Sequence, residues 1–159
     1  MPVPERVSGP YFGEFAPEQE IVHPRSIEVT RKLFTELVDK LCFADQRIHV
    51  DQAYARSQGY ADVILPGPIV YTLVFQLTRR EISWSGLNSQ TEMLRHPSAV
   101  YPEDTLFAKS VILGIGEWHG RRGKTHGLIN VKTTGFNQQD VIILEFERTV
   151  LIPYRISKS

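Results

Sequence analysis

The chain has 159 residues, a formal net charge of zero and a single cysteine. This length predicts one domain with a hydrophobic core of its own. The shares of hydrophobic residues (42%) and charged residues (23%) are those of a globular protein and exclude a disordered chain. A neutral chain is not built to bind nucleic acid or an anionic membrane through bulk charge.

Cys42 has no second cysteine to pair with, and no Cys/His cluster has the spacing of a zinc site. The N-terminus lacks the apolar core of a signal peptide. The most apolar stretch, residues 64–75, is too short to span a bilayer and contains Pro66 and Pro68. We therefore expect no disulfide, zinc site or membrane segment, and a cytoplasmic location.

Residues 1–26 are rich in Pro, Gly and Glu and contain the aromatic residues Tyr11, Phe12 and Phe15. We interpret them as a lead-in whose aromatic side chains pack on the domain. The remaining residues, 27–159, are expected to form that single domain.

Three helices are predicted in chain order. The first has apolar residues at helical spacing and Thr30 as a plausible N-cap; these residues are Leu33, Phe34, Leu37, Val38 and Leu41. A short second helix begins near Asp51 and ends near Gly59. The third, from Pro68 to Leu77, is apolar nearly all round, which predicts a helix wrapped by the rest of the protein.

From residue 100 onwards the pattern changes to strands, over residues 104–113, 127–136 and 141–152. Residues 114–127 contain five glycines and are predicted to form a long hairpin connection, and residues 136–140 a shorter one. Helices followed by an antiparallel meander indicate an α+β fold. A single buried helix beside a long sheet suggests the hotdog arrangement, although the pattern alone leaves other α+β folds open.

His49 lies between the first two predicted helices in Asp45-Gln-Arg-Ile-His49-Val-Asp51. A histidine with a carboxylate in reach is suited to general acid–base catalysis near neutral pH. The alternative is a histidine that packs a loop, with Asp51 as an N-cap. Gly67 precedes the buried helix, where its N–H could stabilise an oxyanion or where glycine could simply relieve a tight turn.

A local basic patch is formed by Arg121, Arg122 and Lys124, which could bind a phosphorylated ligand or could be a solvated hairpin tip. Arg95 and His96, just before Pro97, could equally be edge-strand residues. Spacing alone assigns no role to His23, His119 or His126.

Motifs over most of the chain resemble the MaoC-like dehydratases, or R-specific enoyl-CoA hydratases, of the hotdog fold. They are Tyr11-Phe-Gly-Glu-Phe15, His49-Val-Asp51 followed by Ala53-Tyr-Ala55, Gly67 at the family's His-Gly pair with Pro66 replacing the histidine, residues 94–106 and residues 135–150. The last stretch is similar to the terminal hairpin of the mesaconyl-CoA hydratase branch in particular.

The resemblance implies hydration of a 2-enoyl thioester, or the reverse dehydration. It implies a CoA-linked substrate, a homodimer and no metal or redox cofactor. An Asp and a His would share one water, with Gly67 as the oxyanion donor and His49 as the histidine. The family's Asp-x-Asn-Pro-x-His motif is altered here, because Ala44 stands where the Asp belongs. Asp45 is the preferred carboxylate, and Asp39, expected on the solvated surface of the first helix, is the second candidate.

Two other functions remain open at this stage. The altered motif favours a non-catalytic subunit that binds acyl thioesters or serves in assembly. A hotdog thioesterase would need a carboxylate on the central helix, and the sequence offers only Glu81, at its far end.

Overall fold

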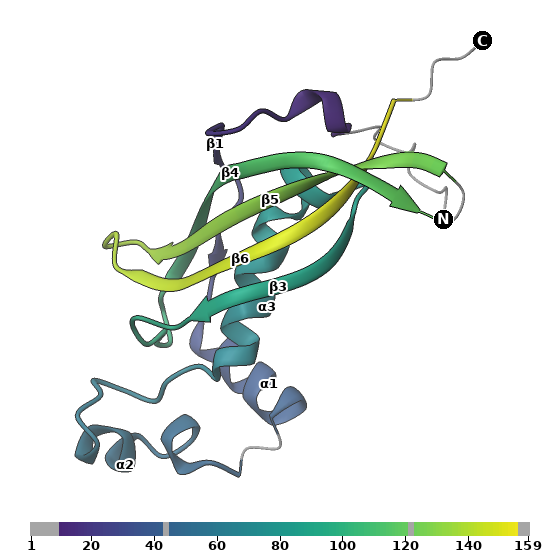
Figure 1. Cartoon of the computed structure of the whole chain (residues 1–159). Coiled ribbons are helices and arrows are strands. Elements are labelled where there is room, and N and C mark those ends of the chain that lie inside the picture. The colour runs from purple at the N-terminus through teal and green to yellow at the C-terminus, as the bar shows by residue number, and fades with distance from the viewer. Residues whose placement is uncertain (1–9, 43–44, 121–122, 156–159) are drawn as a thin grey trace, which may run out of the picture.

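The computed structural model describes residues 10–42, 45–120 and 123–155. A six-stranded antiparallel sheet of order β1-β4-β5-β6-β3, with β2 paired to β4, curls round the helix α3 (Figure 1). The strands are β1 (Glu20–Val22), β2 (Ile27–Glu28), β3 (Leu87–Arg95), β4 (Thr105–Gly120), β5 (Gly123–Asn137) and β6 (Ile142–Pro153). The α+β class predicted from the sequence is confirmed.

The central helix α3 (Gly67–Thr78) follows from an almost unbroken apolar run with Pro68 in the first turn. Its buried side packs on the sheet and consists of Ile69, Val70, Val74, Leu77 and Thr78. A short π-helix, η3 (Arg79–Ser83), extends it. The prediction of burial on every side is wrong, because Thr72 and Gln76 are exposed. One curled sheet covers one side of the helix, and the opposite side is open.

The predicted connection over residues 114–127 is also wrong. There the strands β4 and β5 continue to pair, as far as Gly120 opposite Gly123. The pairing continues through the glycines, with register shifts just before Gly114 and Gly120. At Gly127 the reason is direct, since a Cβ there would lie 2.1 Å from the ring of Phe12, in the short helix η1 (Phe12–Glu14). That close approach requires glycine within a strand.

The sequence-based prediction begins the strands at residue 100 and offers strand β3 only as an edge-strand alternative for Arg95 and His96. Strand β3 includes Arg95, pairs with β6 alone and forms one edge of the sheet. Its polar residues and two register shifts hide the alternation that marks a strand. Of its apolar residues, Leu87 is 64% and Met93 65% exposed.

The helices near the N-terminus agree with the prediction in position. The first, α1 (Arg31–Leu41), begins after Thr30, whose side chain accepts a hydrogen bond from the N–H of Leu33. It buries Phe34 and Val38, whereas Leu41 is 60% exposed. The buried face is therefore centred on Phe34 and Val38 instead of on the 33/37/41 stripe. Asp39 is exposed on this helix, as the sequence predicts.

A 3₁₀ turn, η2 (Arg47–His49), leads into α2 (Gln52–Ser57). The side chain of Asp51 accepts a hydrogen bond from the N–H of Tyr54 and caps α2. Gly59, at φ 90°, follows the helix end, as the sequence predicts.

Part of the N-terminal lead-in belongs to the sheet, because β1 pairs with β4. Its aromatic residues contact the domain: Phe15 is buried, and the ring of Phe12 lies edge-on to Tyr154 at 5.2 Å. In residues 10–42, 45–120 and 123–155, no helix is long and apolar enough to cross a bilayer.

Candidate functional site

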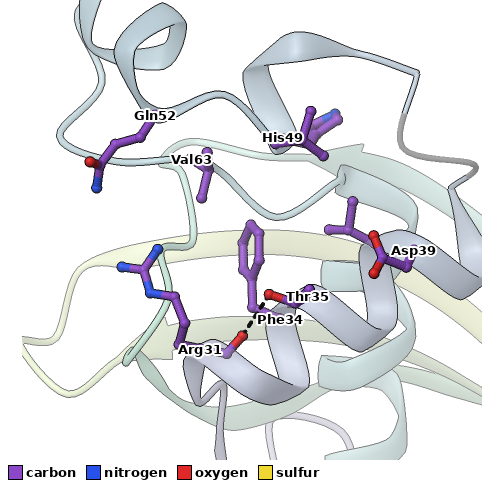
Figure 2. A pocket seen from close by; sticks show the side chains of 9 residues that line it. Arg31, Phe34, Thr35, Asp39, His49, Gln52 and Val63 are labelled. Atoms are coloured by element: carbon purple, nitrogen blue, oxygen red, sulfur yellow. Dashed lines mark hydrogen bonds between the residues drawn. The ribbon is translucent and has the colours of Figure 1, made fainter.

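A cavity of about 350 Å³ opens between α1 and the segment that carries η2 and α2 (Figure 2). Both the histidine and one of the carboxylates considered from the sequence line it. Its lining residues are Arg31, Phe34, Thr35, Val38, Asp39, His49, Val50, Gln52 and Val63. The floor is apolar, and polar groups stand round the rim, as is usual for a small-molecule site.

His49 is held by its ring nitrogen Nδ1, which lies 2.7 Å from the backbone carbonyl oxygen of Ile64. A carbonyl oxygen only accepts, so Nδ1 carries the hydrogen and donates it. The other ring nitrogen, Nε2, lies 3.2 Å from Oε1 of Gln46. An amide oxygen also only accepts, so a neutral ring with its hydrogen on Nδ1 needs the Gln46 amide turned to present its NH2 to Nε2. Nε2 is then the ring nitrogen at which His49 could exchange a proton.

The two candidate carboxylates are placed differently. Asp39 lies on α1 and lines the same cavity as His49. Asp45 lies in the segment before η2 and is not among the cavity-lining residues, and both carboxylates are exposed. Within the described parts of the chain, neither carboxylate forms an ion pair or hydrogen bond with His49. Asp51, the third acid nearby, is occupied by Arg47 at 2.7 Å and by capping α2.

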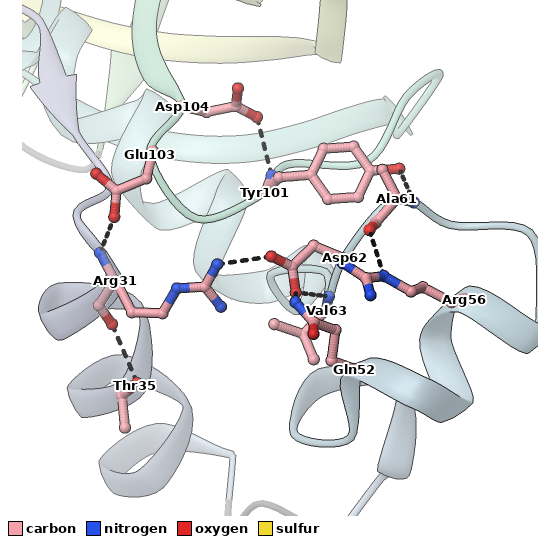
Figure 3. A network of polar contacts seen from close by, with 10 residues as sticks. All are labelled: Arg31, Thr35, Gln52, Arg56, Ala61, Asp62, Val63, Tyr101, Glu103 and Asp104. Atoms are coloured by element: carbon pink, nitrogen blue, oxygen red, sulfur yellow. Dashed lines mark hydrogen bonds and ion pairs between the residues drawn. The ribbon is translucent and has the colours of Figure 1, made fainter.

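A polar network anchors the opposite end of the cavity (Figure 3). Arg31 pairs with Asp62 at 2.6 Å, and Asp62 also accepts hydrogen bonds from Gln52 and from the N–H of Val63. The guanidinium of Arg31, together with these hydrogen bonds, lowers the pKa of Asp62 to about 2. The network joins α1 to α2 across the cavity.

Gly67 is the first residue of α3, as the sequence suggests, and Pro66 precedes it as the N-cap. The N–H groups of Ile69 and Val70 both donate to the carbonyl of Pro66, at 3.0 and 3.1 Å. Pro68 has no N–H. In the residues that the structure describes, nothing accepts the Gly67 N–H, so it is the one free donor of this first turn.

The basic patch cannot be placed in this geometry. Arg121 and Arg122 lie outside the described residues, and so does the side chain of Lys124. Among the described residues, no group of three or more His, Cys, Asp or Glu side chains could hold a metal ion.

A second polar cluster lies in the core, and sequence spacing gave no sign of it. His23, 3% exposed, lies 2.9 Å from Glu81 through Nδ1 and 2.9 Å from the Ser110 hydroxyl through Nε2. Ser110 in turn bonds to Thr133. Glu81, the carboxylate that a thioesterase would need, is thus engaged by a buried histidine.

Arg148, on β6, is 2% exposed and projects between α3 and the sheet. Its Nη2 donates to the Thr78 hydroxyl at 2.7 Å, and its guanidinium lies 4.7 Å from the ring centre of Phe75. The buried Nε and Nη1 have no partner among the described residues. Burial lowers the pKa of Arg148 to about 10. The alternation that places Leu144 and Phe146 on the buried face was a sequence signal for this position.

The fold matches known proteins. The structure of a MaoC-domain dehydratase from Chloroflexus aurantiacus has 26% identity and a TM-score of 0.82, covering 99% of this chain and 44% of that one. A protein of Mycobacterium tuberculosis described as a double hotdog fold gives a TM-score of 0.78 at 17% identity, covering 95% of this chain and 46% of that one. The domain is a hotdog fold.

The family model described as FAS1-like, dehydratase domain region, matches residues 18–146. The chain belongs to this family of MaoC-like dehydratase domains. It is 32% identical to beta-methylmalyl-CoA dehydratase of Chloroflexus aurantiacus, covering 92% of this chain and 41% of that protein. It is 26% identical to mesaconyl-CoA hydratase of Cereibacter sphaeroides, covering 93% and 42%. The chain thus spans less than half the length of these two relatives.

Proposed function

We propose that this chain is a hydro-lyase that adds water to a 2-enoyl thioester, or removes it from a 3-hydroxyacyl thioester, with CoA as the carrier. The observation that carries this proposal is His49, held through Nδ1 by the Ile64 carbonyl on a cavity that also contains a carboxylate. Family membership and two relatives named for CoA-ester hydration and dehydration support it.

In the proposed reaction the oxygen of water bonds to C3 of the enoyl group, and a proton is added to C2. One member of the acid–base pair takes the proton that water loses, and the other supplies the proton to C2; dehydration runs these steps backwards. His49 would exchange its proton at Nε2. The negative charge that develops on the thioester oxygen would be stabilised by the free N–H of Gly67.

Two residues are candidates for the carboxylate of the pair. The sequence motif favours Asp45, whereas the lining of the cavity favours Asp39. The position of Asp39 on the wall shared with His49 favours Asp39. Asp45 remains the alternative if the segment before η2 turns inward when substrate binds.

The test is an assay of the purified chain with crotonyl-CoA and mesaconyl-CoA, following loss of the enoyl absorbance and identifying products by mass. We expect hydration by the wild type and a loss of about 10²–10⁴-fold in kcat for His49→Gln. Lys32→Gln, an exposed change on α1, is the control. Equal rates in wild type and His49→Gln would remove His49 from the mechanism.

The same assay separates the rival functions. A chain that binds these thioesters without converting them would be the non-catalytic binding subunit. Release of free CoA thiol would indicate the thioesterase, although the bond between Glu81 and His23 argues against it.

We also propose that Arg121, Arg122 and Lys124 contact the phosphates of CoA. Replacing the two arginines with alanine should raise KM for the CoA ester while leaving KM for the matching N-acetylcysteamine thioester unchanged. An equal rise for both substrates would contradict phosphate recognition.

A second copy of the chain is the proposed partner. The edge of β3 is unpaired in the described structure, its residues Leu87 and Met93 are exposed, and one side of α3 is open. Pairing of two β3 edges would extend the sheet. Light scattering should give the mass of a dimer, and Met93→Lys should give a monomer; a wild-type monomer would contradict this.

A further inference from the structure

The side chain of His96 has no role in the mechanism above. His96 follows β3 directly, and its ring lies against the first residue of α3. A Cβ on Gly67 would come within 3.0 Å of His96 Nε2 and 3.3 Å of its Cε1. The imidazole edge therefore reaches the residue that bears the free N–H of the first turn.

The ring of His96 has no hydrogen-bond or ion-pair partner within the described parts of the chain. His96 is an exposed residue, and partial desolvation of its ring lowers its pKa, which favours the neutral imidazole. A neutral imidazole offers one N–H donor and one acceptor. His96 thus presents a free N–H donor beside the free N–H of Gly67.

One short segment connects these groups with His49. The Ile64 carbonyl holds His49, the N–H of Ile64 donates to the Ile48 carbonyl at 3.3 Å, and the N–H of Leu65 donates to the Val100 carbonyl at 2.8 Å. Residues 64–67 therefore run between the turn that carries His49 and the segment that follows β3 and contains Val100. Gly67 and His96 are connected to His49 through this segment and are not among the residues that line its cavity.

We propose that His96 is a second oxyanion donor, which together with the Gly67 N–H binds the thioester carbonyl oxygen of the substrate. This inference rests on the proposed hydro-lyase function. The imidazole gives a hydrogen bond to the oxygen as the enolate forms and transfers no proton. It would add a second donor to a first turn in which Pro68 lacks an N–H and two amides are already bonded.

The test compares His96→Leu, which removes the donor, with His96→Gln, which keeps an N–H donor. We expect His96→Leu to lower kcat for crotonyl-CoA hydration by about 10²-fold, the usual effect of losing one oxyanion donor, and His96→Gln to restore at least part of it. Lys32→Leu is the control for surface substitution, and circular dichroism with thermal melting checks that each variant folds.

A second readout does not need turnover. Acetoacetyl-CoA is an enolisable thioester, and its bound enolate is measured by ultraviolet absorbance. We expect the wild type to raise the enolate fraction, His96→Leu to lose most of that rise, and His96→Gln to keep part of it.

The outcomes separate the two proposals. Hydration by wild type with kcat for folded His96→Leu within twofold, and an unchanged enolate signal, overturns the role of His96 and leaves the hydro-lyase function standing. No hydration by wild type, but a His96-dependent enolate signal, overturns the function and supports the donor pair. Neither hydration nor an enolate signal overturns both.

Discussion

The Nδ1–H of His49 donates to the backbone carbonyl of Ile64 across 2.7 Å. This bond selects the tautomer of the neutral ring, because the hydrogen must sit on Nδ1. We expect ¹⁵N NMR at pH 8 to show a bare Nε2 and a protonated Nδ1 for His49. The exposed ring of His119 serves as an internal comparison. A protonated Nε2 on neutral His49 would contradict the assignment of proton transfer to that atom.

The two carboxylates near His49 are distinguished by conservative substitution. We expect Asp39→Asn to lower kcat for enoyl-CoA hydration by about 10²-fold or more, because Asp39 lines the cavity and acid–base groups contribute on this scale. Asp45→Asn should change kcat by only a few fold. Glu36→Gln, an exposed change on the same helix, is the control. The reverse ranking would assign the catalytic role to Asp45.

Arg148 is expected to destabilise the fold that encloses it. A buried guanidinium with two unpartnered nitrogens carries a desolvation cost that one hydrogen bond and two aromatic rings do not fully offset. We expect Arg148→Met to raise the free energy of unfolding by about 1–2 kcal/mol, as measured with urea. A loss of stability in Arg148→Met would instead mean that Nε and Nη1 have partners in solution, such as buried water. Arg148→Lys, which keeps the charge, is the matched comparison and should not stabilise.

His23 makes the stability of the protein depend on pH. Desolvation lowers its pKa below the ordinary 6.5, although Glu81 opposes this shift. As the pH falls below about 6.5, the unfolded chain binds a proton before the native protein does, so the free energy of unfolding decreases, by up to about 1.4 kcal/mol per pH unit. His23→Gln keeps a donor and an acceptor but does not titrate. We expect the wild type to lose more stability than this variant between pH 7 and pH 5, and parallel curves would exclude His23 as the source.

The elements predicted well are those whose burial follows a simple period. An unbroken apolar run predicts the helix α3, and a strict alternation of apolar and polar residues predicts the strand β6. The strand β3 could not be found in this way, because an edge strand is exposed on both faces. The five glycines of residues 114–127 resemble a loop in composition, and only the ring of Phe12 over Gly127 shows why glycine is needed in a strand.

For the site, His49 and Gly67 were identified through resemblance to a family, and Gly67 does begin α3. The sequence could not reveal that Asp39 faces the cavity, because this depends on how α1 rotates to bury Phe34 and Val38. The contact between Gly67 and His96 could not be predicted either, because 28 residues separate them along the chain.

The segment from Ile64 to Gly67 limits the distance between two groups of the proposed site. Its first carbonyl fixes the histidine, and its last N–H is the proposed oxyanion donor, with only Leu65 and Pro66 between them. Three residues of extended chain span no more than about 10 Å. The distance between His49, proposed to act at C3, and the Gly67 N–H, proposed to bind the oxygen on C1, is therefore limited by the length of this segment. An inserted residue here would shift which carbon of the acyl chain meets the histidine, whereas side-chain changes elsewhere in the cavity would alter only what surrounds it.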